Sequence, residues 1–520
     1  MKKFKKLISA LMATTLAVSA LCGAGMLSGC KNKADPEAIQ VSVAKMGYGT
    51  EWLHNIAKAY TEKSGVSVQI TEEIGQSGNS KISDQVESLV SSIDIAFVEE
   101  TMAGKIYEGS VSTGGNTYDC LYADLTDLYK KELDGENGAT IESKMEQDTK
   151  DFLNIEGKYY ALPWAGGVTG IVMNNAKWKE LGFTDADIPM TTDQLMDICD
   201  RIVAKEVSPF IYSASDEYYT MFAPIFFAQY EGNKSMNYFL NGRDPDGNVT
   251  EHLYTYDGQV AALRVMKDLI ATPNYQDQAS ESLDFSDMQA YFLNGKSVFC
   301  VNGSWLEIEM ANYEGADIGF LRTPVISEIV EKATSIKTAA TNAGKSVDET
   351  LAAVIAEIDA GKTSSELSGV EQEDFNIVKE ARSMSYMSSG GKAVAYIPSY
   401  STKVEKAKDF LAFMYSDAGL NIYYETLKGA TIPVTPTNGY TADITLTPFR
   451  QAINKAETDG FIFNYATNAK VFVLGGVDRY FRNGTTTIVS NFKQGATVEQ
   501  VITANKENIA SNWSNIKQYI

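Results

Sequence analysis

Side chains that usually carry covalent or metal chemistry are scarce in this sequence. It holds two histidines, His54 and His252, and neither belongs to a Ser-His-Asp, Cys-His or zinc-ligand pattern. The sequence shows no phosphate-binding glycine loop and no nucleophile elbow. Carboxylates can catalyse without histidine, but the 67 acidic residues are too many for a catalytic pair to stand out. The composition therefore argues against an enzyme without excluding a carboxylate-based one.

Three cysteines lie beyond position 30, and their number and spacing suit neither a disulfide framework nor a metal site: Cys120, Cys199 and Cys300. We expect buried free thiols, with at most one disulfide. The segment from Asn241 to Asn248 places oxygen ligands at the spacing of a calcium loop. It lacks the glycine and the terminal acid of such loops, so we interpret it as a turn and predict no metal and no cofactor.

Cys30 lies at the end of a segment with the features of an export signal. Four lysines within residues 1–6 precede an uncharged apolar stretch, 7–26, and the sequence Leu27-Ser28-Gly29-Cys30 follows. The pattern is similar to a bacterial lipoprotein signal, in which the cysteine is acylated and becomes the new N-terminus. An ordinary secretory signal or an N-terminal membrane helix is the alternative. We predict a signal peptide over 1–29, a tether over 30–37, and a lipid anchor at Cys30 on the outer face of the cell membrane.

Composition limits the partners of the remaining chain. The pool is 44% hydrophobic and 11% aromatic, and its length is sufficient for two or more domains. The formal net charge of the full sequence, −22, includes the four lysines of the signal segment, and it argues against nucleic acid and against anionic lipid surfaces. No later apolar run approaches the length of a membrane span. We therefore expect membrane contact through the lipid only.

Candidate binding residues must be positioned by an α/β framework. Residues 39–43 alternate as a strand, apolar residues recur at helical spacing over 52–60, and residues 66–70 alternate again. This order predicts a β-α-β unit. A short apolar run over 93–98 reads as a buried parallel strand and ends in two glutamates. In open α/β sheets, ligands bind where such strands end.

Later segments continue the pattern. A hairpin near 155–160 leads into Pro163-Trp164-Ala165-Gly166-Gly167 and then into an apolar strand. Thr191 and Gln194 are spaced as a capping box before a helix. A strand over 297–301 ends in a turn of small residues followed by Trp305, and residues 403–415 form an amphipathic helix.

In this order and spacing the chain resembles the extracellular solute-binding proteins of ABC importers, in the group that includes maltose- and oligosaccharide-binding proteins. The resemblance covers nearly the whole chain after the signal. It is carried by the lipoprotein signal and by five further stretches: Trp52–Ile70, Gly157–Pro163 leading into Val172–Asn175, Asn294–Lys296 leading into Asn302–Trp305, Ile397–Pro398 with the helix after it, and Leu427–Gly429 leading into Ile432–Val434.

The resemblance implies a two-lobed α/β fold of the periplasmic-binding-protein type. It implies three chain crossings between the lobes, near 162–167, 388–391 and 461–464. The first lobe would comprise 38–163 and 391–460, and the second lobe 167–388 and 467–520.

Residues 323–384 depart from the family pattern. The segment is polar and strongly helical, with capping boxes that begin at Ser346 and Ser368. We interpret it as a helical insertion in the second lobe. It would serve either as a partner or lid surface or as peripheral elaboration.

The function implied by the resemblance is capture of an extracellular carbohydrate, an oligosaccharide, by hinge closure. A monomer would then deliver it to the permease subunits of an ABC transporter. A polyol or a peptide is the alternative solute, and a surface-anchored carbohydrate-active enzyme is the alternative from another class. Turnover of a glycan would decide for the enzyme.

Aromatic planes and forked polar groups would hold the sugar in the cleft. Trp305 is the first candidate, because the resembled proteins place an aromatic platform at this strand end. Trp164 lies at the first crossing, and Trp52 begins a helix beside Tyr48 and Glu51, where glycines let the backbone approach a ligand. Core packing is the alternative for each of the three tryptophans.

Two acidic residues, Glu99 and Glu100, follow the strand over 93–98 and could accept hydrogen bonds from sugar hydroxyls. Solvated carboxylates are the alternative for this pair. The remaining candidates come from a helix start and from the third crossing: Tyr218, Tyr219, Asn464 and Tyr465.

Overall fold

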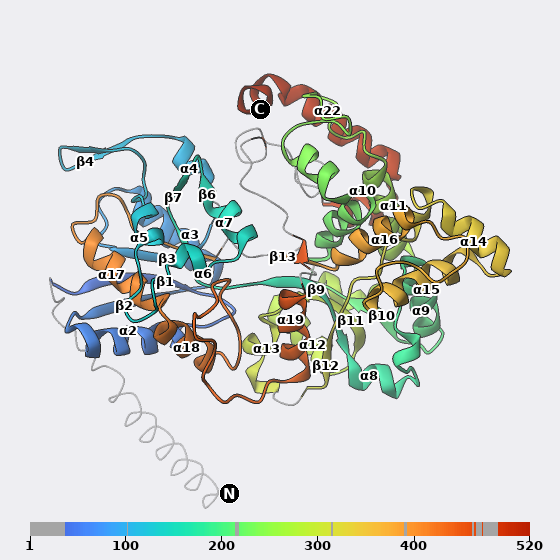
Figure 1. Ribbon diagram of the computed structural model, residues 1–520, viewed down its shortest axis with the longest axis horizontal. Helices are drawn as coiled ribbons and strands as arrows, with labels where there is room; N and C mark the ends of the chain where they lie inside the picture. Colours follow the sequence, from blue (N-terminus) through green and yellow to red (C-terminus); the bar gives the residue numbers. More distant parts are fainter. Residues whose placement is uncertain are drawn as a thin grey trace, which may run out of the picture.

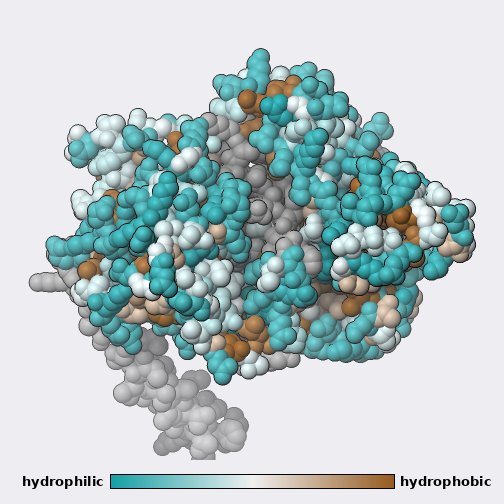
Figure 2. Space-filling view, in the orientation of Figure 1, coloured by the Kyte–Doolittle hydropathy of each residue, from teal (hydrophilic) through white to brown (hydrophobic). Residues whose placement is uncertain are grey.

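A computed structural model of the chain describes residues 37–100, 102–213, 218–313, 316–388, 393–459, 462–463, 471 and 487–520. The elements form two bodies side by side, each with its own sheet (Figure 1). The predicted two-lobed α/β class is confirmed. The face of both lobes seen in Figure 2 is mostly hydrophilic, as the charged composition leads one to expect.

The first lobe has a five-stranded sheet in the order β2-β1-β3-β14-β8. Strands β1, β2 and β3 run parallel, and β14 pairs antiparallel with both β3 and β8. The predicted β-α-β start is confirmed, with β1 and β2 in register from Ile39 with Val68 onward. The strands are β1 (Ile39–Lys45), β2 (Val68–Ile74), β3 (Ile95–Glu99), β8 (Leu162–Pro163) and β14 (Ala393–Tyr396).

The helix α2 (Glu51–Ser64) shows why the local sequence folds as it does. Its buried residues Trp52, Ile56 and Tyr60 recur at helical spacing and face the lobe core. Gly65 ends the helix in the left-handed conformation, at φ 75°, which glycine adopts without strain. The other first-lobe helices are α3 (Gly75–Glu87), α4 (Ala103–Tyr107), α5 (Thr126–Lys130), α6 (Ile141–Lys144), α7 (Gln147–Leu153), α17 (Val404–Met414) and α18 (Asp417–Thr426). Two short hairpins pair β4 (Val111–Thr113) with β5 (Asn116–Tyr118) and β6 (Asn154–Ile155) with β7 (Lys158–Tyr159).

The second lobe is built on a sheet in the order β10-β11-β9-β13-β15, with β12 also paired to β9. Strand β9 is buried along its whole length and pairs antiparallel with β11, β12 and β13. The strands are β9 (Val168–Asn174), β10 (Ser208–Ile211), β11 (Ser297–Gly303), β12 (Ile318–Leu321), β13 (Tyr386–Ser388) and β15 (Ile462–Phe463).

Helices surround this second sheet. Thr191 caps α9 by accepting the Gln194 backbone N–H at 3.2 Å, as predicted. The second-lobe helices outside the insertion are α8 (Asn175–Glu180), α9 (Thr192–Val203), α10 (Phe222–Leu240), α11 (Asp257–Ala271), α12 (Phe285–Leu293), α13 (Leu306–Glu309), α19 (Pro448–Thr458), α21 (Ile488–Lys493) and α22 (Val498–Ile516). Among the described residues, no helix has both the length and the apolar character needed to cross a membrane.

The predicted insertion comprises α14 (Ser335–Ala343), α15 (Val347–Asp359) and α16 (Gln372–Ser383). The capping box at Ser346 and Glu349 is confirmed. The second predicted box is wrong, because α16 starts after Glu371 rather than near Ser368. The insertion is not a loosely attached appendage, since residues of α15 and α16 belong to the second-lobe core.

A carboxylate shared by two arginines ties the insertion to the sheet. Asp359, at the end of α15, accepts hydrogen bonds from Arg322 Nη1 at 2.7 Å and from Arg382 Nη2 at 2.8 Å. Arg322 follows β12 and Arg382 lies on α16, so one side chain joins three elements. Burial beside a second guanidinium lowers the pKa of Arg322 to about 10.

The chain passes between the sheets after Pro163 and returns between Ser388 and Ala393, with residues 389–392 outside the described part. Helix α19 differs from the expected boundary. Its residues Phe449 and Ile453 pack with β9 and β12 of the second lobe, although the sequence placed it in the first lobe. The chain has therefore crossed again before Pro448, ahead of the predicted third crossing at 461–464.

The smaller expectations can be checked in the same structure. Cys120, Cys199 and Cys300 are free and buried. The segment from Asn241 to Asn248 forms a turn in which the Asn248 backbone N–H donates to Asp244 at 2.8 Å. Within the described part of the chain, no group of His, Cys, Asp or Glu side chains could hold a metal ion.

Candidate functional site

Ends of strands from the two sheets face each other at the junction between the lobes. We refer to these two sets of strand ends as the facing edges of the sheets. In the first sheet, β1 and β3 end at Lys45 and Glu99, and β14 begins opposite Glu99. In the second sheet, β11 ends at Gly303 and β9 begins at Val168, beside the end of β13. Residues 164–167 connect the two edges directly. Because ligands of open α/β sheets bind where parallel strands end, this junction is the candidate site.

Ser304 is the best-connected residue of the junction. Its Oγ lies 3.1 Å from the Tyr48 hydroxyl of the first lobe, and its backbone N–H donates to the Val168 carbonyl at 2.9 Å. Arg450 Nη2 donates to the Ser304 carbonyl at 2.9 Å. The Tyr48 hydroxyl also donates to the carbonyl of Gly166 in the connecting segment. We refer to these contacts of Tyr48, Val168 and Arg450 with Ser304 as the Ser304 clamp.

Tyr48 is thus engaged within the protein. Burial raises the pKa of its hydroxyl to about 12, so the group stays protonated and can keep donating. Among the groups that act on this pKa, Arg450 lowers it, whereas Glu457 and Glu99 raise it. The structure therefore places Tyr48 as a bridge between the lobes, and a contact of its hydroxyl with solute would have to break that bridge.

Trp305 follows the clamp directly and is partly buried. Although it belongs to the second-lobe chain, its side chain packs against the core cluster of the first lobe. The indole lies against Gly303, since a Cβ built on that glycine would approach the ring within 2.3 Å. Only glycine leaves room for the ring at this place. The side chain that was ranked first for binding therefore lies at the lobe junction.

Glu99 has its backbone fixed by a residue that sequence reasoning missed. Asn79, on α3, donates to the Glu99 carbonyl at 2.9 Å and accepts the Glu99 backbone N–H at 2.7 Å. Asn79 is 8% exposed, so this paired contact is shielded from water. Nothing in the polar sequence of α3 indicates that one asparagine meets the end of β3. These two hydrogen bonds from Asn79 hold the partly buried Glu99 at the facing edge of the first sheet.

Glu100 and Glu51 lie differently from Glu99. The Glu100 carboxylate accepts hydrogen bonds from Ser83 Oγ at 2.7 Å and from the Tyr122 hydroxyl, so it is used inside the first lobe. Glu51 is exposed at the start of α2 and lines a surface groove between α2 and α18. The structure does not bring Glu51 together with Trp305.

Three of the predicted aromatic residues pack inside the lobes. Trp52 and Trp164 are fully buried and stacked, with ring centroids 5.6 Å apart. The Trp164 indole N–H donates to the Val98 carbonyl at 3.0 Å. Tyr219 is fully buried in the second-lobe core, and its hydroxyl accepts from Gln276 at 2.6 Å. These rings would support a binding surface rather than form it.

Four other predicted positions cannot be placed. Cys30, Asn464 and Tyr465 lie outside the described residues, and so does the side chain of Tyr218.

A buried polar seam on α19 was also missed by sequence reasoning. Glu457 accepts a hydrogen bond from Thr431 Oγ1 of the first lobe at 3.1 Å. Burial, with a smaller effect from the nearby Glu146, raises the pKa of Glu457 to about 7. Thr431 and Arg450 act in the opposite direction. Arg450, Asn454 and Glu457 recur at intervals of four and three residues along α19. In the sequence, polar residues at this spacing indicate an exposed helix face.

The seam also contains polar atoms without a hydrogen bond to another described group. These are Arg450 Nε, Asn454 Oδ1 and the Tyr423 hydroxyl oxygen. Arg450 Nε lies 3.7 Å from Glu307 Oε2, which is an ion-pair contact but not a hydrogen bond. Sites with several such atoms are where bound water is expected.

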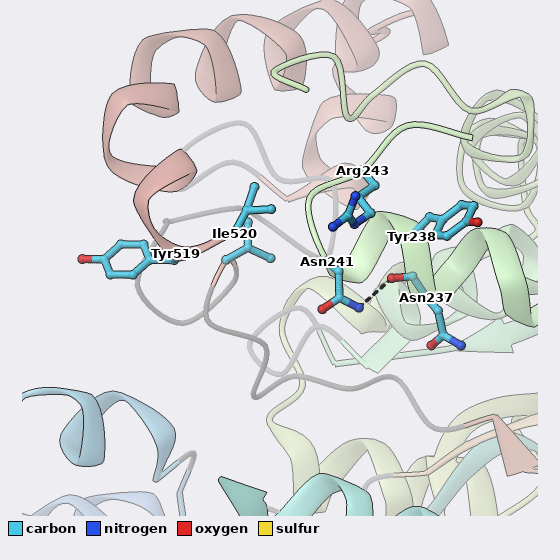
Figure 3. Close-up of a pocket in the computed structure, with 7 residues that line it drawn as sticks. Asn237, Tyr238, Asn241, Arg243, Tyr519 and Ile520 are labelled. Carbon is cyan, nitrogen blue, oxygen red and sulfur yellow. Dashed lines mark hydrogen bonds between the residues drawn. The ribbon is translucent and has the colours of Figure 1, made fainter. Parts of the chain in front are cut away.

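A pocket elsewhere in the second lobe has different properties. It measures about 390 Å³ and lies between the end of α10 and the last residues of the chain (Figure 3). Asn241 Nδ2 there donates to the Asn237 carbonyl at 2.8 Å, and Arg243 Nη1 donates to the Gly247 carbonyl at 2.8 Å. These polar groups bind one another, and none of the described residues that line the pocket belongs to the junction.

Comparison with known proteins agrees with this architecture. The sequence profile of the family described as bacterial extracellular solute-binding protein matches residues 55–448. A multiple sugar-binding protein of Streptococcus mutans is 27% identical over 154 residues, which is 29% of this chain and 34% of that protein. The chain thus aligns with only about a third of this curated relative.

Solved structures are similar over nearly their whole length. Apo RafE of Streptococcus pneumoniae has a TM-score of 0.57 at 12% identity, covering 92% of this chain and 98% of its own. A chitin oligosaccharide binding protein has a TM-score of 0.59 at 16% identity, covering 92% and 100%. Maltose-bound MalE3 of T. maritima has a TM-score of 0.54 at 16% identity, covering 91% and 100%. At these identities the likeness establishes the fold.

Proposed function

Because the chain belongs to the bacterial extracellular solute-binding protein family, we propose that it captures an extracellular oligosaccharide between its two lobes. The family is one of binding proteins for ABC transporters, and the prediction that the chain is not an enzyme is thereby confirmed. The relatives named for sugars support a carbohydrate as the solute. The permease of an ABC importer would be the partner that receives it.

The observation that carries the proposal is the placement of Trp305 at the lobe junction. An indole offers a broad apolar face to the C–H surface of a sugar ring and one N–H donor. Glu99, held by Asn79 at the facing edge, offers oxygens that accept hydrogen bonds from sugar hydroxyls. A solute that touches both would bridge the lobes. Such a ligand shifts the equilibrium between open and closed arrangements by its differential affinity for them.

The direct test is a titration of the full chain with mono- and oligosaccharides, with a polyol and a short peptide as the alternative solutes. Trp305→Ala should weaken the tightest glycan by ~30-fold, because truncating an aromatic anchor commonly costs ~2 kcal/mol. Trp513→Ala is the matched control, since Trp513 is also partly buried and lies on α22 of the same lobe. Equal affinities of the two variants would remove Trp305 from the site. If the chain bound only the polyol or only the peptide, that compound class would replace oligosaccharides as the proposed solute.

Attachment through a lipid on Cys30 is the remaining part of the proposal. Its support is the sequence Leu27-Ser28-Gly29-Cys30 after an apolar segment, together with membership of an extracellular family. The anchor would keep the binding protein at the outer face of the membrane, near its permease.

A further inference from the structure

The orientation of Trp305 depends on the residues on either side of it. Ser304 precedes it, and Trp305 itself is the N-cap of α13, where Glu307 lies in the first turn. A residue that grips both flanks of Trp305 would set the direction of its indole. Such a residue is present, and it comes from a helix far along the sequence.

Arg450 makes both contacts from α19. Its Nη2 donates to the Ser304 carbonyl at 2.9 Å, one residue before the tryptophan. Its Nε lies 3.7 Å from Glu307 Oε2, two residues after it. Arg450 is 2% exposed, so its contact with the Ser304 carbonyl is shielded from water, whereas the Glu307 side chain is 28% exposed.

The same peptide is gripped from the first lobe. The Tyr48 hydroxyl lies 3.1 Å from Ser304 Oγ. Ser304 is therefore held through its side chain by one lobe and through its carbonyl by α19. The indole then rests on Gly303, which leaves it little freedom to turn.

A buried guanidinium contributes less to the stability of the fold than its many contacts suggest. Removing a charged group from water costs several kcal/mol, and apolar side chains of similar volume are often as stabilising or more so. Arg450 also keeps one buried N–H without a hydrogen bond, at Nε, within the described structure. A side chain selected for packing would not show this pattern. One that fixes a main-chain carbonyl through Nη2 and pairs with a carboxylate by charge alone would show it.

We infer that Arg450 is a positioning residue for Trp305, holding the indole in the orientation that a sugar ring meets at the lobe junction. The inference rests on the proposed function for its use, but the positioning itself is a property of the unliganded chain. Through Arg450, the helix α19 would therefore affect the affinity of the site for its solute.

The first measurement needs no solute. Quenching by acrylamide reports how freely small molecules reach a tryptophan, and the Trp305→Phe protein supplies the signal of the other four. In the full chain, Arg450→Met should raise the quenching of Trp305 towards that of an exposed indole. Arg450→Lys keeps the charge and one donor and should lie between Met and the parent. Arg264→Met should leave the signal unchanged, because Arg264 pairs with Glu328 on an exposed surface of the same lobe.

The second measurement is the affinity for maltotriose, raffinose and chitotriose. Arg450→Met should weaken whichever binds by ~10-fold, as loss of a charge-assisted hydrogen bond commonly does, with partial rescue by Arg450→Lys. Tyr48→Phe, which removes only a hydroxyl, is the second variant if Arg450→Met does not fold, and it should raise Trp305 quenching in the same way.

Unchanged Trp305 quenching in folded Arg450→Met overturns the inference, and so does reduced affinity with unchanged quenching. If none of the three glycans binds the parent chain while quenching responds as stated, the positioning role stands and the proposed solute class fails. The two failures are therefore distinguishable.

Discussion

Replacing Glu457 with glutamine should remove a pH dependence of stability that the parent chain shows between about pH 4.5 and pH 7. Burial raises the pKa of this carboxyl from 4.5 to about 7 in the folded chain. The folded state therefore binds the proton more tightly than the unfolded state does. The stabilisation is fully present below pH 4.5 and is lost as the pH rises through 7.

The size of the effect follows from the two pKa values. A difference of this size corresponds to about 3 kcal/mol of unfolding free energy, and the partial exposure of the side chain makes that an upper bound. For domains of 150–250 residues, ~2–4 °C of melting temperature accompanies each kcal/mol, so the midpoint should shift by ~6–12 °C at most. Glutamine keeps the acceptor for Thr431 and carries no charge, so Glu457→Gln should be the more stable protein at pH 8 and similar at pH 4.5.

The assay compares melting midpoints of the parent, Glu457→Gln and Glu425→Gln from pH 4.5 to pH 8. Glu425 is exposed on α18 and serves as the matched acid, so its variant should follow the parent at every pH. Subtracting the curves cancels the contributions of all other titrating groups. Parallel pH curves for the parent and Glu457→Gln would refute the reasoning, as would a loss of stability in that variant at all pH values.

Three further substitutions test other parts of the structure. Asp359→Asn removes the charge shared by Arg322 and Arg382 and should cost ~1–2 kcal/mol in urea unfolding, because Asp359 is itself exposed to solvent, whereas an unchanged midpoint would show that the insertion is held by packing alone. Gly303→Ala places a methyl group 2.3 Å from the indole and should weaken oligosaccharide binding, measured by titration, more than it lowers the melting temperature. Cys30→Ala should move the chain from the membrane fraction to the soluble fraction, and firm retention in the membrane would contradict lipid anchoring.

Local sequence patterns predicted those features that depend on neighbours in the chain. The helical spacing of Trp52, Ile56 and Tyr60 is set within one helix, and it was foreseen. The stacking of Trp52 on Trp164 was not, because the two residues are brought together only when the whole first lobe has folded. An apolar tryptophan at a strand end looks the same in the sequence whether it faces core or cleft.

The polar residues of the junction were harder to predict for a related reason. Asn79, Arg450 and Glu457 each act on a partner that is distant in sequence or on another lobe. The apolar spacing of Phe449 and Ile453 indicates a helix, but it carries no information on which sheet that helix covers. For this reason the lobe boundary near 460 was misplaced although the helix itself is unremarkable.

The position of β14 determines how late in synthesis the first lobe can be completed. It lies between β3 and β8 in the first sheet, yet it begins at residue 393, long after β3 ends at residue 99. A ribosome releases the N-terminal segments first, so β3 and β8 wait with unpaired edges while the second lobe is being made. The lobe whose strands appear first thus stays incomplete until β14 has been made, and a nascent chain of this protein needs protection of its early strands until residue 393 has emerged.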